Sequence, residues 1–457
     1  MQETDFDEMD TSGMDGKASG KTPPEPGFKK TKVGWVPEEW EVTRMRNLIR
    51  NLDAGTSVKG EDRPRQDGEK GILKVSAVSY DGFLPSECKV IPDENLDRVD
   101  TSPKEGHVII SRANTRDLVG SSVFVERDYP ELFLPDKLWQ VELREDKAVS
   151  ARWLNYALST DRMRHLISSA ATGSSGTMKN ISQKRFLSLP IAVPPLDEQL
   201  RTAGILSTWD RAINQIDNLI AKKERRKKAL MQHLIKGKTR FSNHKDKEWC
   251  QVTLSDIADY YSGLSGKSGD DFGSGNPYVP YKNIFENNIV DLGNLDYVEI
   301  EEGESQNRVQ HGNLLVTTSS EVPEEVGMTS VVMGNPEELY LNSFCFGVRF
   351  DSFEKVIPEF AAYLFRAEPA RRAIYPLAQG STRFNLSRRE FMTLTMEVPS
   401  IQEQKKIASV LSTCDEEISI LRDERQAHKR QKKGIMQKLL KGKVRVSTEA
   451  TSSQVEA

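Results

Sequence analysis

Residues 189–241 read LPIAVPPLDEQLRTAGILSTWDRAINQIDNLIAKKERRKKALMQHLIKGKTRF, and residues 394–446 read LTMEVPSIQEQKKIASVLSTCDEEISILRDERQAHKRQKKGIMQKLLKGKVRV. The two stretches align without a gap at an offset of 205 residues, with 21 identities among 53 pairs. Chance does not produce such a match, so the chain contains an internal repeat. Each copy begins with a short apolar run and a proline and then takes on a helical pattern.

Each copy predicts one long amphipathic helix, over residues 196–241 and 401–445. About 40 residues at about 1.5 Å per residue give a rod of about 60 Å, and Gly237 and Gly442 are placed to end the rods as C-cap glycines. Two matched helices with narrow apolar seams should pack on each other. The polar residues in the middle of each seam have two open explanations, local solvation or a functional contact. The first seam contains Leu206, Trp209, Ile213, Ile216, Ile220, Lys223, Lys227, Leu230 and Leu234; the second contains Leu411, Cys414, Ile418, Leu421, Arg425, His428, Lys432, Ile435 and Leu439.

The segments between the helices also repeat, more faintly. GHVIISRANT (106–115) matches GNLLVTTSSE (312–321), LPDKLWQVEL (134–143) matches LNSFCFGVRF (341–350), and GSSGTMKNIS (173–182) matches GSTRFNLS (380–387). These matches include strand-like runs, so we expect an α+β fold with two globular domains and two long helices. The predicted division is an acidic disordered tail (1–30), a first domain (31–195), a central helix (196–241), a second domain (242–400), a distal helix (401–445) and a flexible tail (446–457). Trp40 and Trp249, which open corresponding segments, are expected to anchor the cores.

The charge is distributed unevenly along the 457 residues. The net charge is −4, yet residues 196–241 carry eleven Lys or Arg against five acids, and residues 401–445 carry twelve against six. Solvated helix faces explain such segments as readily as a nucleic-acid contact does. No apolar run approaches the ~18 residues of a membrane span, and the acidic start is unlike a secretory signal. The four separated cysteines indicate neither a disulfide scaffold nor a zinc ribbon, and a reducing cytoplasm is the expected location.

Motifs for enzyme chemistry are incomplete. DGKASGKT (15–22) and YSGLSGKS (261–268) approach a phosphate-binding loop, but both lack the first glycine. Asp136, Glu145 and Lys147 resemble the carboxylate set of a metal-dependent nuclease. However, the intervening residues alternate like one strand, which would separate the carboxylates by about 30 Å. The histidines have no metal-ligand spacing, and no adenine-methylation motif occurs. The chain therefore offers no recognisable catalytic centre.

Two similar but divergent globular units joined through paired helices suit a protein that reads a split DNA site. Unequal loops would read unequal half-sites, and basic helices could attract phosphates. The blocks VPPLDEQ, ILSTWDRAI and KKALMQHLIKGKTRF, with their second copies, resemble the conserved regions of the specificity subunit of type I restriction–modification enzymes. GWVPEEWEV (34–42), SRANT (111–115) and GSSGTMKNIS (173–182) resemble the recognition half of that family. The resemblance covers about residues 30–445.

The resemblance implies the remaining expectations. Such a subunit has two target recognition domains joined by antiparallel helices in a pseudo-two-fold arrangement, and each domain reads half of an asymmetric bipartite site on double-stranded DNA. Two methyltransferase subunits dock along the helices and methylate adenine at N6, and two ATP-dependent translocase–nuclease subunits complete the complex. S-adenosylmethionine, ATP and Mg²⁺ then belong to the partners, and this chain holds no cofactor and no metal. The acidic N-terminal tail departs from the family pattern.

Base readout favours Arg, Lys, Asn and Gln on loops that face a groove. The candidates compete with ordinary roles: Asn180 and Asn385 as turn or cap residues, Ser182 and Ser387 likewise, and Arg116 and Lys282 as phosphate contacts. The counterparts Thr318 and Ser320 are less convincing readers. The candidate DNA-binding residues are Arg112, Asn114, Arg116, Lys179, Asn180, Lys282, Arg383, Asn385 and Arg388.

Partner docking is expected at Glu198, Gln199, Glu403 and Gln404 and on the exposed helix faces, although acids in the first turn of a helix also suit its dipole. Two other functions compete with the DNA-specificity hypothesis. One is a stand-alone nuclease that uses Asp136, Glu145 and Lys147; the other is a coiled-coil scaffold without DNA specificity.

Overall fold

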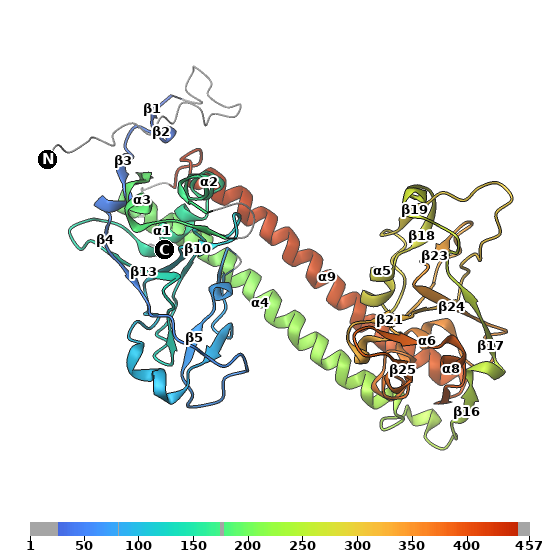
Figure 1. Cartoon of the computed structure of the whole chain (residues 1–457). Coiled ribbons are helices and arrows are strands. Elements are labelled where there is room, and N and C mark those ends of the chain that lie inside the picture. The colour runs from blue at the N-terminus through green and yellow to red at the C-terminus, as the bar shows by residue number, and fades with distance from the viewer. Residues whose placement is uncertain (1–25, 81, 174–177, 447–457) are drawn as a thin grey trace, which may run out of the picture. The chain divides into compact units, whose positions relative to one another are not determined.

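The computed structural model describes residues 26–80, 82–173 and 178–446 (Figure 1). It divides into two compact units, one formed by Met1–Asn214 with Gln426–Ala457 and the other by Gln215–Arg425. Each unit thus contains one globular part and a portion of each long helix. Most of the N-terminal tail expected over 1–30, and residues 447–457 of the expected C-terminal tail, lie outside the described residues.

The two long helices are α4 (Leu196–Ile235, 40 residues) and α9 (Ile401–Leu439, 39 residues). Both begin at the residue expected from the repeat and end six residues before the expected ends. Gly237 and Gly442 follow the ends with φ of 64° and 66°. Because this left-handed conformation is easily reached only by glycine, the two predicted C-cap glycines are confirmed.

The first unit is built on a four-stranded sheet in the order β11-β9-β13-β4 and a three-stranded sheet in the order β12-β5-β8. Short two-stranded ribbons complete it: β1-β2, β15-β3, β6-β7 and β10-β14. Three helices, α1 (Ala151–Leu158), α2 (Asp161–Ala170) and α3 (Gln183–Ser188), belong to the same unit. The strands are β1 (Phe28–Thr31), β2 (Gly34–Pro37), β3 (Glu41–Arg44), β4 (Ile49–Ala54), β5 (Gly71–Leu73), β6 (Val78–Ser79), β7 (Gly82–Phe83), β8 (Cys88–Val90), β9 (Val108–Ser111), β10 (Ala113–Asn114), β11 (Ser122–Phe124), β12 (Leu132–Phe133), β13 (Leu138–Leu143), β14 (Lys179–Asn180) and β15 (Pro190–Val193).

The second unit repeats this topology. Its four-stranded sheet has the order β17-β24-β20-β22, its three-stranded sheet has the order β19-β18-β23, and its short sheets are β21-β26-β25 and β16-β27. The helices are α5 (Tyr281–Glu286), α6 (Pro358–Leu364), α7 (Glu368–Ile374) and α8 (Arg388–Met392). The strands are β16 (Cys250–Thr253), β17 (Ala258–Ser262), β18 (Phe272–Val279), β19 (Asp296–Val298), β20 (Leu314–Thr317), β21 (Ser319–Ser320), β22 (Thr329–Val331), β23 (Tyr340–Leu341), β24 (Cys345–Phe350), β25 (Ala378–Gln379), β26 (Phe384–Leu386) and β27 (Thr395–Val398).

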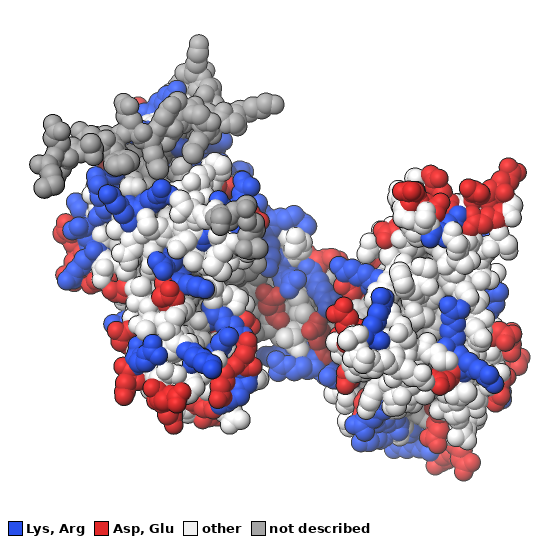
Figure 2. Space-filling model, in the orientation of Figure 1, with Lys and Arg blue, Asp and Glu red and all other residues white. Residues whose placement is uncertain are grey.

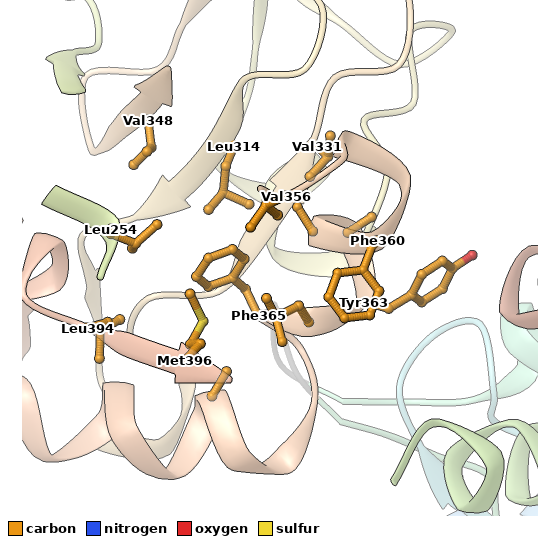
Figure 3. Close-up of a cluster of buried hydrophobic side chains, with 14 of the residues drawn as sticks. Leu254, Leu314, Val331, Val348, Val356, Phe360, Tyr363, Phe365, Leu394 and Met396 are labelled. Atoms are coloured by element: carbon orange, nitrogen blue, oxygen red, sulfur yellow. The ribbon is translucent and has the colours of Figure 1, made fainter. Parts of the chain in front are cut away.

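The core of the second unit lies between its four-stranded sheet and the helices that cover it. Figure 3 shows Leu314, Val331 and Val348 from the sheet facing Phe360 and Phe365, and all five side chains are buried. Leu234 of α4 and Leu411 of α9 belong to the same cluster. In the first unit the corresponding cluster includes Leu206 and Leu439 from the same two helices. The ends of both rods are therefore part of the domain cores.

The polar residues in the middle of each helix seam form ion pairs across the seam. In the second unit Lys223 contacts Glu417 at 2.7 Å, Arg425 contacts Asp217 at 2.8 Å, and Lys227 pairs with Asp415. Residues that come later in α4 pair with residues that come earlier in α9, so the two helix segments are antiparallel. Ile216, Ile220 and Ile418 fill the apolar positions between them. The two explanations left open by the sequence are thus replaced by a third, interhelical pairing.

One polar cluster occurs once in each unit. In the first unit the Tyr156 hydroxyl donates to Asp210 Oδ2 (2.6 Å), Lys432 Nζ donates to Asp210 Oδ1 (2.5 Å), and the Lys432 ammonium lies 5.4 Å from the Tyr156 ring centroid. Burial raises the pKa of Tyr156, and the charge of Asp210 raises it further, so the hydroxyl stays a donor. Tyr363, Asp415 and Lys227 repeat the cluster in the second unit, and Figure 3 shows the Tyr363 hydroxyl pointing away from the apolar core.

A half-buried arginine, Arg366, connects the end of α5 to β22 in the second unit. Arg366 donates to the carbonyl oxygens of Ile284 (2.5 Å), Phe285 (3.1 Å) and Asn287 (2.7 Å) at the end of α5, and to that of Thr329 (2.6 Å) on β22. A six-residue helix leaves its last carbonyls without intrahelical partners, and the guanidinium supplies them. Burial lowers the pKa of Arg366 to about 10, which still leaves the group charged at neutral pH.

Candidate nucleic-acid interface

A two-stranded ribbon gathers four of the predicted DNA-binding residues of the first unit. Strand β10 pairs with β14, with Ala113 opposite Asn180 and Asn114 opposite Lys179. The main chain of Arg112 is fixed beside this ribbon, because its N–H donates to the Lys137 carbonyl (3.0 Å) and its carbonyl accepts from the Ile181 N–H (2.9 Å). Residues about 65 positions apart in the sequence thus present their side chains at one place.

The Arg112 side chain is positioned but only loosely engaged. Its Nη2 lies 3.5 Å from Asp136 Oδ2, and the side chain is 31% exposed. The Nε atom is buried and has no hydrogen-bond partner among the described residues. Asp136 also bonds to Ser57, whose hydroxyl accepts from the Asp136 N–H (3.3 Å). A guanidinium held by one long contact retains donors for a second acceptor, as readout of a base edge or binding of a phosphate requires.

The other candidates of the first unit differ in exposure. Asn180 is exposed and Lys179 is half-buried, both on β14. Asn114 uses its side chain locally, accepting from the Thr115 N–H (2.8 Å) and donating to Ser111 Oγ (3.4 Å). Arg116 is exposed on the loop after β10. Asn180 and Arg116 are therefore the freest to meet a ligand.

The second unit builds the same ribbon from different side chains. Ser319 lies opposite Asn385 and Ser320 opposite Phe384, and the Leu386 N–H donates to the Thr318 carbonyl (2.8 Å) just as Ile181 does to Arg112. Arg383 and Asn385 are both exposed here. The shared hydrogen-bond pattern shows that the two ribbons are equivalent, and their different residues make them chemically distinct.

Local geometry gives the surroundings of the remaining predicted residues. Ser182 and Ser387 are N-cap residues, accepting from Arg185 N and Glu390 N. Lys282 is exposed on α5, where it lies 3.7 Å from Glu286. One further candidate has an internal contact. Arg388 donates to Ser262 Oγ (2.7 Å) and is half-buried. Asn180 and Asn385 lie in short strands rather than in turns.

The four residues predicted to dock a partner are buried, each with at most 2% of its surface exposed: Glu198, Gln199, Glu403 and Gln404. Glu198 accepts from Trp40 Nε1 (3.0 Å) and from Arg445 Nε (2.9 Å). In the second unit Glu403 accepts from Arg240 Nε (2.7 Å), and the Arg240 guanidinium lies 5.3 Å from the Trp249 ring centroid. Trp40 is a core anchor as expected, whereas Trp249 is half-buried.

The two glutamines brace each long helix against its globular domain. Gln199 accepts from the Ser150 N–H (2.9 Å) and donates to the Ala148 carbonyl (3.0 Å), next to the start of α1. Gln404 does the same with the Ile357 N–H (3.0 Å) and the Lys355 carbonyl (2.7 Å), next to α6. The docking role predicted for the four residues is therefore not supported by their placement, because their polar atoms are used inside the chain.

The nuclease-like set is not assembled. Asp136 lies before β13 and pairs with Arg112, and the extended β13 separates it from Glu145. Among the described residues there is no group of three or more His, Cys, Asp or Glu side chains that could hold a metal ion. No helix in the described part of the chain is long and apolar enough to cross a membrane.

Acidic side chains define a part of the second unit that DNA should avoid. Figure 2 shows red atoms gathered at the end of the unit formed by β18 and β19, where Asp291, Asp296, Glu299, Glu301 and Glu302 are exposed. Phosphates are repelled by such a surface, so the ribbon β21-β26 with its exposed cation is the better candidate.

Comparisons with known proteins identify the family. The family model for the type I restriction modification DNA specificity domain matches residues 37–223 and 246–428. The chain is 25% identical to the putative type I restriction enzyme MjaX specificity subunit of Methanocaldococcus jannaschii over 449 residues, which cover 93% of this chain and 98% of that protein. It is 28% identical to the type I restriction enzyme EcoEI specificity subunit of Escherichia coli over 203 residues, which cover 44% of this chain and 34% of that protein.

Solved structures share the fold. The crystal structure of the type I restriction–modification S subunit from M. genitalium matches with a TM-score of 0.55 and 14% identity, covering 92% of this chain and 98% of that one. A chain from a structural study of complex assembly and conformational transition in the type I system matches with a TM-score of 0.52 and 15% identity, covering 90% and 99%. Because the family model matches well over half of the sequence, on two segments that correspond to the two repeats, the chain belongs to the family of type I restriction–modification specificity subunits.

Proposed function

We propose that each globular unit reads one half of an asymmetric bipartite DNA site, and that the long helices set the spacing of the halves and dock methyltransferase subunits. The chain itself would be non-catalytic. Methylation of adenine at N6 and cleavage would belong to the partner subunits, two for modification and two for translocation and cleavage, together with their S-adenosylmethionine, ATP and Mg²⁺.

One observation carries the DNA-reading part of this proposal. The ribbons β10-β14 and β21-β26 have the same backbone pairing and share one asparagine, Asn180 or Asn385. However, Asn114 and Lys179 of the first are replaced by Ser320 and Phe384 in the second. The arginines beside them, Arg112 and Arg383, also lie at different positions of the two ribbons. Two ribbons with the same backbone pairing but different side chains are suited to recognising two unequal sequences. The reason is that sequence is read by hydrogen bonds from side chains to base edges.

Replacing Arg112 with alanine should relax the sequence requirement in one half-site only, and replacing Arg383 should relax the other. Loss of a good base contact costs about 1–3 kcal/mol of discrimination, so the preference at one position should fall by about tenfold or more. The measurement is the set of methylated motifs in cells that carry each variant with the cognate methyltransferase, compared with a deletion strain.

Arg50→Ala is a charge-matched control, because Arg50 is 61% exposed on β4 and forms a surface ion pair with Glu142 at 3.1 Å. Its motif should be unchanged. If Arg112→Ala weakened binding to all sequences equally and lowered the salt dependence, the residue would be a phosphate contact and not a base reader.

Partner docking is better placed on the exposed faces of the helices than on the buried residues at their starts. Ile420 of α9 is 66% exposed and Leu219 of α4 is 41% exposed, although both lie on otherwise polar helix faces. Lys222, Arg225, Arg226 and Lys228 are exposed on the same stretch of α4. Such a surface suits a protein partner that covers the apolar side chains and places acidic residues against the cations.

Ile420→Glu should reduce the methyltransferase that co-purifies with the chain by at least about tenfold, since a buried unpaired charge is costly at an interface. The neighbouring Ser419 is also exposed, and Ser419→Glu adds the same charge without removing an apolar group. Equal co-purification with both variants would place the docking surface elsewhere.

A further inference from the structure

Among the described residues, Phe344 is the aromatic residue with the largest exposed fraction. It immediately precedes β24 and is 55% exposed, whereas its neighbours Cys345 and Phe346 are completely buried. A single exposed apolar residue is ordinary on a protein surface, so exposure alone assigns no role to Phe344. The residues around Phe344 point to a role.

The main chain of Phe344 is held rigidly. Its N–H donates to Asn342 Oδ1 (2.9 Å), and its carbonyl accepts from both the N–H (3.0 Å) and the hydroxyl (2.6 Å) of Thr318. Thr318 in turn is hydrogen-bonded to Leu386 on the ribbon. The ring is thus attached to the same backbone frame that positions the candidate DNA-binding side chains.

A cation lies against the ring. The Arg383 guanidinium is 5.5 Å from the ring centroid, and its Nη2 donates to Ser319 Oγ (3.0 Å). Together the two side chains present a flat apolar surface next to a positive charge, beside the exposed Asn385. In a DNA groove the charge suits a phosphate or a guanine, while the apolar surface has one matching group among the base edges, the 5-methyl group of thymine.

The first unit has different chemistry at the same position. Arg112 N–H donates to the Lys137 carbonyl at 3.0 Å, as Thr318 N–H donates to that of Phe344, so Lys137 is the counterpart of Phe344. Around Lys137 the adjacent groups are Arg112 and Asp136. The same backbone position therefore has a cation and a carboxylate around it in the first unit and carries an aromatic ring in the second.

We propose that Phe344 contacts the 5-methyl group of a thymine in the half-site read by the second unit, and that this contact helps to distinguish the two half-sites. The inference rests on the proposed DNA-reading function and adds one specificity-determining residue with a defined chemical target. Arg383 positions the ring and contacts the neighbouring base or phosphate.

The test uses the full chain in complex with its methyltransferase and duplexes that contain its methylated motif. Each thymine of the second half-site, on either strand, is replaced singly by deoxyuridine, which lacks only the methyl group. One replacement should weaken binding about fivefold, the size expected for one buried methyl. Phe344→Ala should bind the thymine and uracil duplexes equally, and Phe344→Leu should keep part of the discrimination.

Lys137→Ala is the matched control, since it changes the equivalent position in the first unit and should leave the uracil effect intact. If no uracil replacement affects the wild-type complex, or if Phe344→Ala discriminates as well as the wild type does, the inference is overturned while the DNA-reading function stands. A wild-type complex without any sequence preference would overturn both.

Discussion

A chain that lacks residues 218–224 of α4 together with residues 418–424 of α9 should prefer half-sites with a shorter spacer. Seven residues shorten a helix by about 10 Å, close to three base pairs at about 3.4 Å each. Seven residues also fall only about 20° short of two helical turns, so the remaining faces keep nearly their original orientation. The measurement is the spacer that the shortened chain prefers when it binds a pool of duplexes with different spacers, because the deletions also remove Leu219 and Ile420 of the proposed docking surface.

The two deletions are matched through the ion pairs of the seam. Asp217 with Arg425, and Lys227 with Asp415, flank the removed segments on both helices, so both pairs can re-form. Deleting 218–224 alone would shift the pairing by one heptad and should abolish binding to the bipartite site. If the doubly shortened chain still bound duplexes with the original spacer best, the helices would not set the spacing.

Arg366→Met should destabilise the second unit by about 3 kcal/mol. The substitution keeps an unbranched apolar stem but leaves the carbonyls of Ile284, Phe285 and Asn287 without their donor, and each unsatisfied buried acceptor costs about 1–3 kcal/mol. Urea unfolding of the full chain measures the loss, and amide hydrogen exchange over residues 281–287 locates it.

Arg372→Met provides the control. Arg372 is 73% exposed, and its contact with Glu368 is an i,i+4 pair on the helix surface, so its removal should change stability by less than about 0.5 kcal/mol. Since the Tyr281 hydroxyl of α5 donates to the Ser319 carbonyl (2.6 Å), Arg366→Met should also loosen the ribbon that carries the second half-site reader. Equal stability of both variants would show that water replaces the guanidinium.

The repeat made the architecture predictable, because local and duplicated signals are visible in a single sequence. The starts of α4 and α9, the glycines that follow them, and the matched strands β9 and β20 follow from spacing and turn chemistry. GHVIISRANT and GNLLVTTSSE form the same elements, and the glycines with which they begin, Gly106 and Gly312, have φ of 77° and 78°. Such features depend only on neighbours along the chain.

The roles that depend on distant partners could not be predicted. Glu198 and Gln199 resembled exposed first-turn residues, yet their partners Trp40, Arg445 and Ser150 lie 49 to 247 positions away. The polar residues in the helix seam, such as Lys223 and Lys227, could be assigned to ion pairs only once the structure gave their acidic partners on the other helix. Phe344 had no signal of its own beyond its alignment with Lys137, because nothing in LNSFCF distinguishes an exposed ring from a buried one.

The partition of the chain has a consequence for its synthesis. The second unit, Gln215–Arg425, is continuous in sequence, whereas the first unit needs Gln426 onward, including Leu439 in its core and Arg445 against Glu198. Domains generally fold as they emerge during translation. Here the domain that is translated first must wait for the last-made segment, so the second domain reaches its native state earlier, and truncation after Arg425 would leave the N-terminal domain incomplete.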